Sequence, residues 1–124
     1  MKPLNKTALQ PLLTRISQGV DSEIRSITPK TATSFELRMS VQDANRGFDW
    51  IDIIFAFEGV SDARLLDDNQ LAHLDMSEGI SIIFESGEIA FCVGEVTTLS
   101  RAKESALFLQ TQSLKYEETQ FTGM

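Results

Sequence analysis

The spacing of apolar residues changes once along this chain, from a helical repeat to a two-residue repeat that covers most of the sequence. Leu9, Leu12, Leu13 and Ile16 recur at helical spacing, and after Gly19 apolar residues alternate with polar ones. No later segment carries a helical pattern long enough to connect two parallel strands. The sequence therefore predicts an α+β fold, in which one N-terminal amphipathic helix precedes about seven strands in a mainly antiparallel sheet.

The N-terminal helix is expected over residues 7–18. Thr7 and Gln10 have the spacing of a capping box, in which two side chains satisfy free backbone donors at the start of a helix. Pro11 then lies in the first turn, where its missing N–H costs least. Gly19 supplies a left-handed residue to end the helix. We interpret this helix as packing on the core, with a partner-binding helix as the alternative.

Residues 21–118 are expected to form the sheet. Residues 48–58 are predicted as its central strand, because apolar side chains occur on both faces. A hairpin is predicted around Ser86–Gly87, which suits a tight turn. Residues 105–118 are predicted as one long final strand, bulged at 110–113. The other expected elements are a short strand with Ile24 and Ile27 that ends at Thr28–Pro29, a half-buried strand over 34–41, a turn at 43–47, a strand over 60–66 and a polar segment over 67–78.

The length of 124 residues fits one domain, expected to span 1–124, since the chain has no repeat and no low-complexity linker. No apolar window approaches the ~18 residues of a membrane span. The N-terminal residues lack the apolar core of a signal peptide. We therefore expect a cytoplasmic protein.

Several kinds of chemical site lack the residues they need. Cys92 is the only cysteine, which excludes an intramolecular disulfide and a thiolate zinc site, and its apolar surroundings predict a buried thiol. His73 is the only histidine, so one chain cannot supply a multi-histidine metal site. Asp67 and Asp68 begin a segment that has Ala72 where a calcium-binding loop requires glycine. We expect no metal and no cofactor.

Acidic residues are concentrated in the middle of the chain. The net charge is −7, which argues against binding to nucleic acid or to an anionic membrane. Residues 43–95 hold 12 acids against Arg46 and Arg64 only. One interpretation is a surface that selects a cationic protein partner. The alternative is that these acids simply occupy the solvent-exposed faces of strands.

Seven residues are candidates for partner binding, and no residue is a candidate for catalysis. Six are acids of the central segment, and the seventh is a tryptophan that could anchor a partner at the rim of the core. They are Asp49, Trp50, Asp52, Glu58, Asp62, Asp67 and Asp68.

The order of motifs over residues 48–118 resembles small bacterial proteins of unassigned role, some of which are grouped with immunity proteins of polymorphic toxin systems. The resemblance consists of Trp50 before an apolar strand that ends in Phe57-Glu58-Gly59-Val60, an Ile-rich hairpin from Ile80, and a final strand that ends Lys115-Tyr116-Glu117-Glu118. It does not extend to the N-terminal third. The resemblance implies a small acidic α+β protein that neutralises a partner by binding, so no catalytic residue is carried over.

We interpret the chain as a small, non-enzymatic cytoplasmic binding protein that engages a protein partner through an acidic sheet surface. An immunity protein that neutralises a basic toxin is the most concrete version. One alternative is a small-ligand-binding domain or minor enzyme with a pocket between helix and sheet. Another is a structural homodimer, formed through a sheet edge or an apolar face.

Overall fold

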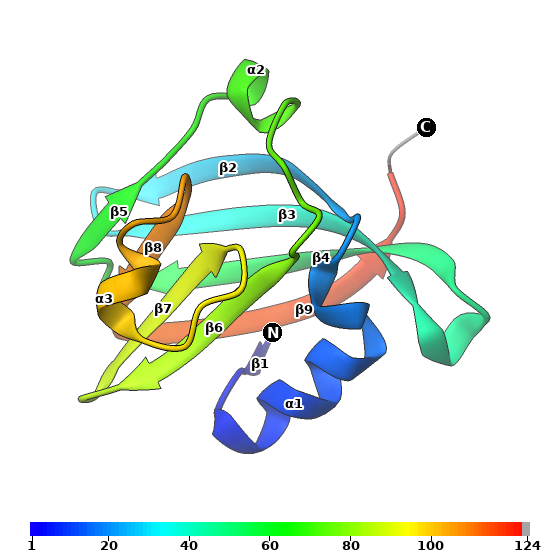
Figure 1. The fold of residues 1–124 in the computed structure, drawn as a ribbon, viewed down its shortest axis with the longest axis horizontal. Coiled ribbons are helices and arrows are strands. Elements are labelled where there is room, and N and C mark those ends of the chain that lie inside the picture. The colour runs from blue at the N-terminus through cyan, green and yellow to red at the C-terminus, as the bar shows by residue number, and fades with distance from the viewer. Residues whose placement is uncertain (123–124) are drawn as a thin grey trace.

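The computed structural model describes residues 1–122, which form two antiparallel sheets that share one core (Figure 1). The α+β class and the antiparallel pairing are as predicted, but the single sheet of about seven strands is wrong, because the strands divide between two sheets. The five-stranded sheet contains, in spatial order, β1 (Lys2–Pro3), β9 (Ser113–Gln120), β4 (Asp49–Glu58), β3 (Ser34–Asp43) and β2 (Glu23–Thr31). The four-stranded sheet contains β5 (Asp62–Arg64), β8 (Phe108–Thr111), β7 (Glu88–Val93) and β6 (Ile80–Glu85).

Two chain segments pass from one sheet to the other at a shared corner. β4 pairs with β9, and beyond the corner β5 pairs with β8, so one two-stranded ribbon continues through both sheets. At the corner, the Thr111 hydroxyl donates to the Glu58 carbonyl (2.7 Å) and the Gln112 amide donates to the Gly59 carbonyl (3.3 Å). The predicted single strand over 105–118 is therefore wrong, since its two halves belong to different sheets.

Side chains from both sheets meet in a core that aromatic rings dominate. Phe91 of the four-stranded sheet lies between Phe55 and Phe57 of β4, with ring centroids 5.3 and 5.5 Å apart. β4 lies between β9 and β3, as expected of the predicted central strand. A smaller cluster, outside this core, packs Cys92 and Phe108 under α3 (Leu99–Ala102). Cys92 is buried, as predicted, and its burial raises the pKa of the thiol to about 11.

The helix α1 (Lys6–Arg15) follows β1, so it is not the first element, and it covers one end of the molecule (Figure 1). Its N-cap is Asn5, whose side-chain oxygen accepts a hydrogen bond from the Ala8 amide at 2.9 Å. The predicted capping box at Thr7 is therefore wrong. The helix ends three residues before the end of the predicted 7–18 segment.

A one-turn 3-10 helix, η1 (Ser17–Gly19), follows α1 and leads into β2. Ser17, Gln18 and Gly19 all have positive φ angles, so the chain leaves the helix before the glycine that was predicted to end it. β2 also differs from prediction, because it continues through Pro29 to Thr31. Proline is tolerated there because β2 is an edge strand and needs no donor on its open side.

The remaining elements are short. η2 (Ala44–Arg46) forms the turn between β3 and β4, as the turn prediction over 43–47 expects. α2 (Asp68–Leu71) lies at the opposite end of the molecule from α1 (Figure 1). Ser86 and Gly87 have φ angles of 53° and 78° and join β6 to β7, which confirms the predicted hairpin. Within residues 1–122, no helix is long and apolar enough to cross a membrane.

Candidate functional site

The seven residues predicted to bind a partner do not form one surface. Asp49 and Glu58 occupy the two ends of β4, and a strand of ten residues extends over about 30 Å. Asp62 lies on the edge strand β5, beyond the corner from Glu58. Asp67 and Asp68 begin α2, outside both sheets. A single continuous acidic surface made of these seven residues is therefore not present.

Asp52 is fully buried, so its carboxylate is not available to a partner. The Ser40 hydroxyl (2.6 Å), the Arg38 guanidinium (2.7 Å) and the Thr122 hydroxyl (2.7 Å) all donate hydrogen bonds to it. Burial on its own would raise the pKa of Asp52, but these three hydrogen bonds outweigh burial and lower it. Asp52 is thus an ionised, internally satisfied group and not part of an exposed acidic surface.

Asp49 and Trp50 belong to a patch that we call the aromatic face, formed by Val20, Phe48, Asp49, Trp50 and Phe121. Phe48 is 56% exposed, Val20 41% and Trp50 39%. The Trp50 and Phe121 rings contact each other, with centroids 5.8 Å apart. The pairing of β4 with β9, two strands that are distant in sequence, brings Trp50 close to Phe121, which directly follows β9. The patch combines apolar rings with an exposed carboxylate.

The turn before β4 holds Phe48 in an uncommon backbone conformation. Its φ angle is 67°, in the left-handed region, which costs an ordinary L residue about 1–2 kcal/mol. Two hydrogen bonds fix it there: the Phe48 amide donates to the Asp43 carbonyl (2.9 Å), and the Gln42 side chain donates to the Phe48 carbonyl (3.3 Å). Strain of this kind, on a bulky and exposed residue, is typical of a functional surface.

Trp50 stands between two hollows of the aromatic face. One has a volume of about 670 Å³ and is bounded by Arg46, Asp49, Trp50, Ile51, Glu118, Thr119, Gln120 and Phe121. The other has a volume of about 280 Å³ and is bounded by Ile16, Ser17, Val20, Asp21, Ser22, Gln42, Phe48 and Trp50. Because Trp50 lines both hollows, a partner that contacts its indole also has access to both of them.

A second buried carboxylate, Asp43, lies directly behind the turn. The Arg15 guanidinium donates from Nε to Oδ1 (3.0 Å) and from Nη2 to Oδ2 (2.6 Å), while the Asn45 amide also donates to Oδ1 (2.9 Å). The hydrogen bonds from Arg15 lower the pKa of Asp43 against the opposing effect of burial. Arg15 also bonds Glu118 of β9. Asp43 therefore connects α1 and the turn, and sequence reasoning missed it because Arg15 lies 28 residues away.

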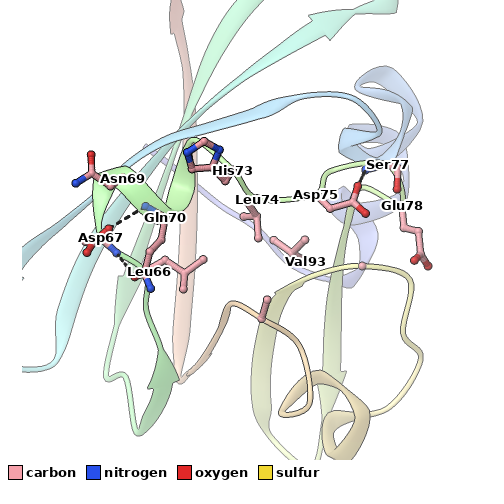
Figure 2. Close-up of a pocket in the computed structure, with 12 residues that line it drawn as sticks. Leu66, Asp67, Asn69, Gln70, His73, Leu74, Asp75, Ser77, Glu78 and Val93 are labelled. Carbon is pink, nitrogen blue, oxygen red and sulfur yellow. Dashed lines mark hydrogen bonds between the residues drawn. The ribbon is translucent and has the colours of Figure 1, made fainter.

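The acidic hollow is a separate surface, between the α2 segment and the end of β7 (Figure 2). Its volume is about 710 Å³, and Leu66, Leu74 and Val93 supply apolar walls. Acids surround these walls: Asp67, Asp75 and Glu78. Asp67 accepts from the Gln70 amide (2.8 Å) and Asp75 from the Ser77 amide (2.9 Å), so both also order their own loop.

Charge is distributed unevenly between the sheets and this hollow. Residues 65–100 contain seven acids and no lysine or arginine. In the described part of the chain, none of the three acids that line the acidic hollow takes part in an ion pair, whereas Asp43 and Asp52 of the five-stranded sheet do. The acids of the hollow therefore carry negative charge that no ion pair within residues 1–122 offsets.

The described residues offer no candidate metal site beside these surfaces. In residues 1–122, no group of three His, Cys, Asp or Glu side chains is arranged to hold a metal ion. Comparison with protein-family models, curated proteins and solved structures finds no match for the chain. The aromatic face and the acidic hollow are therefore the structural basis for a proposed function.

Proposed function

We propose that this protein is a non-enzymatic binding protein that engages a basic protein partner through the aromatic face. The observation that carries the proposal is Phe48, an exposed phenylalanine on a strained turn, beside the exposed Trp50. Folding alone does not account for either ring, because a partly exposed ring forgoes part of the roughly 1.5–3 kcal/mol that full burial of a large apolar side chain contributes. A partner that covers both rings would recover that free energy.

The chemistry of the face favours a partner with apolar and basic side chains together. Aromatic residues that project from a surface are the usual anchors of protein interfaces. Asp49 and Asp21 are exposed acids at the two hollows, and the net charge of −7 attracts a cationic partner at long range. Arg46 also lines the larger hollow, and it contacts the buried Asp43 at 3.5 Å.

An immunity protein that neutralises a basic toxin is the most concrete version of this function. Its support is the resemblance of residues 48–118, in which Trp50 opens the matching segment, together with the negative charge. Such a protein needs a rigid binding surface and no catalytic group. A cytoplasmic location would suit this role.

Partner capture from the native host tests the proposal. Wild-type protein is expected to retain a basic protein that Phe48→Ala and Trp50→Ala each bind about 30-fold more weakly, since an aromatic anchor contributes about 2 kcal/mol or more. The matched control is Leu65→Ala, which truncates another exposed apolar residue, 38% accessible, outside the aromatic face. Equal capture by all four proteins would contradict the proposal.

Charge reversal separates the aromatic face from the acidic hollow. Asp49→Lys is expected to slow association and to reduce the salt dependence of binding. The double variant Asp67→Lys, Asp68→Lys alters the other surface and is expected to have the smaller effect. The opposite order of effects would assign the partner to the acidic hollow.

The acidic hollow favours a second candidate function, the binding of a small organic cation. A cavity of about 710 Å³ with apolar walls and carboxylates at its edge is of the size and character of ligand sites. It lies beside α2, not between α1 and a sheet as the sequence-based alternative supposed. A thermal-shift screen of primary amines tests it: stabilisation that Asp75→Asn and Glu78→Gln remove would support a ligand, and no stabilisation by any amine would dismiss it.

A further inference from the structure

The aromatic face rests on the two buried aspartates described above, one on each side. Asp43 lies at the end of β3 on the core side, under the turn that carries Phe48. Asp52 lies on the outer side of β4, two residues beyond Trp50. Both side chains are fully buried; Asp43 is paired with Arg15 and Arg46, and Asp52 is paired with Arg38.

Asp43 holds the turn by its main chain and its side chain together. Its carbonyl accepts the Phe48 amide (2.9 Å), and its carboxylate accepts the Asn45 amide (2.9 Å) and both Arg15 donors. The side chain thus ties the turn to α1, and the carbonyl fixes the residue with the left-handed backbone. If Arg15 were replaced, the buried Asp43 carboxylate would lose the two hydrogen bonds that it accepts from the guanidinium.

Asp52 holds the other side through the C-terminal segment. The Thr122 hydroxyl donates to Asp52 Oδ2 at 2.7 Å, and the neighbouring Phe121 packs on Trp50 at 5.8 Å between ring centroids. β9 ends at Gln120, so no strand pairing fixes residues 121 and 122. In the described part of the chain, the Thr122–Asp52 hydrogen bond ties the segment after β9 to β4 beside the Trp50–Phe121 pair.

We infer that Asp43 and Asp52 are positioning residues of the binding site: the first presents Phe48, and the second presents the Trp50–Phe121 pair. The inference rests on the proposed function. It also gives Asp52 a new role, since the sequence suggested direct contact with a partner, and the structure keeps the carboxylate beneath the rings. A preorganised face loses less conformational entropy on binding.

The test uses the free protein, because Trp50 is the only tryptophan and its fluorescence reports on the face directly. Thr122→Val and Asp52→Asn are each expected to make Trp50 more accessible to acrylamide quenching, because Phe121 is released. Asp43→Asn is expected to speed hydrogen exchange of the Phe48 and Asn45 amides by about tenfold. Ile89→Val, a core change in the four-stranded sheet, is the control for general destabilisation.

Two outcomes would overturn the inference. The first is that Thr122→Val and Asp52→Asn leave the acrylamide quenching of Trp50 unchanged. The second is that Asp43→Asn speeds hydrogen exchange at the turn no more than Ile89→Val does. Thr122→Val is informative because it removes one hydroxyl and no charge, and Arg38 and Ser40 still bond Asp52, so it should lower the melting temperature less than Asp52→Asn does. The proposed function has its own test in partner capture. If the variants change quenching and exchange as expected but no partner is captured, the proposed function is rejected and the positioning role of the two aspartates is retained.

Discussion

Phe48 illustrates how one residue can work against the stability of its own fold. Its backbone is left-handed and its ring is exposed, so neither conformation nor burial favours phenylalanine at this position. Glycine adopts the same backbone without a steric cost. The proposed binding of a partner would account for phenylalanine at this position.

Phe48→Gly is expected to keep or raise the free energy of unfolding, by up to about 1 kcal/mol, while it weakens partner capture. Urea denaturation measures the first effect and capture measures the second. Phe57→Ala is the contrasting variant, because that ring is fully buried and its loss should cost about 3–5 kcal/mol. A clear loss of stability in Phe48→Gly would show that the ring serves the fold after all.

Stability should fall in acid because of Asp43 and Asp52. Hydrogen bonds from Arg15 lower the pKa of Asp43 in the folded protein. Burial would raise the pKa of Asp52, but hydrogen bonds from Ser40, Thr122 and Arg38 outweigh it and lower that pKa too. Both groups therefore contribute stability above the ordinary aspartate pKa of about 4, and that contribution is lost as the pH falls through the lowered values.

Unfolding free energies measured in urea from pH 7 to pH 2 test this expectation. Wild-type stability is expected to stay level down to about pH 4 and then to decline, and Asp43→Asn and Asp52→Asn should each make the decline shallower. If both variants lose as much unfolding free energy in acid as the wild type does, other carboxylates cause the decline.

For single residues, the sequence predicted the surroundings correctly where neighbours along the chain determine them, and not where distant residues do. The apolar neighbours of Cys92 predicted its burial correctly. Asp52 alternates with apolar residues and therefore resembled an exposed acid on a wet strand face. What buries it comes from elsewhere in the chain, Arg38 from the adjacent strand and Thr122 from the C-terminal segment, and no local pattern reveals that.

Individual elements were predictable when their pattern was continuous. The central strand over 48–58 and the hairpin around Ser86–Gly87 follow from alternation and from turn chemistry. The segment over 105–118 was predicted as one strand with a bulge. A polar interruption such as the one near Gln112 gives the same sequence pattern at a bulge as at a corner between two sheets. Only the pairing of β8 and β9 with different sheets distinguishes a corner from a bulge.

Two glycines at element ends should respond differently to alanine. Gly79 and Gly87 have φ angles of 72° and 78°, so both substitutions pay a left-handed cost of about 1–2 kcal/mol. At Gly79 a Cβ atom would also lie 2.1 Å from the Gln18 carbonyl oxygen, whereas at Gly87 it would meet no atom within 4 Å. Gly79→Ala is expected to be clearly the more destabilising in thermal denaturation, and equal effects would contradict the close packing of η1 on the start of β6.

For the whole molecule, two groups of acids stand out by their different surroundings. Asp43 and Asp52 are buried and paired with arginines, and the acids of the acidic hollow line an open surface without ion pairs in the described chain. The net charge of −7 is therefore a poor guide to where a partner binds. Charge favours the acidic hollow, and exposed aromatic surface favours the aromatic face.

The oligomeric state distinguishes a hetero-partner from self-association. If the aromatic face serves another protein, the free chain is expected to be a monomer by light scattering at micromolar concentration. A dimer that Trp50→Ala converts to monomer would instead favour the structural homodimer. Leu65→Ala again serves as the control, because it changes an exposed apolar residue outside the face.

Hydrogen exchange of the protein alone and in complex with its captured partner tests the central claim most directly. The account predicts slower exchange on binding in residues 44–50 and 119–122, where the turn and the end of β9 form the aromatic face. It predicts little change in residues 66–78, which form most of the acidic hollow. Protection confined to residues 66–78, with the turn unchanged, would contradict the account and assign recognition to the acidic hollow.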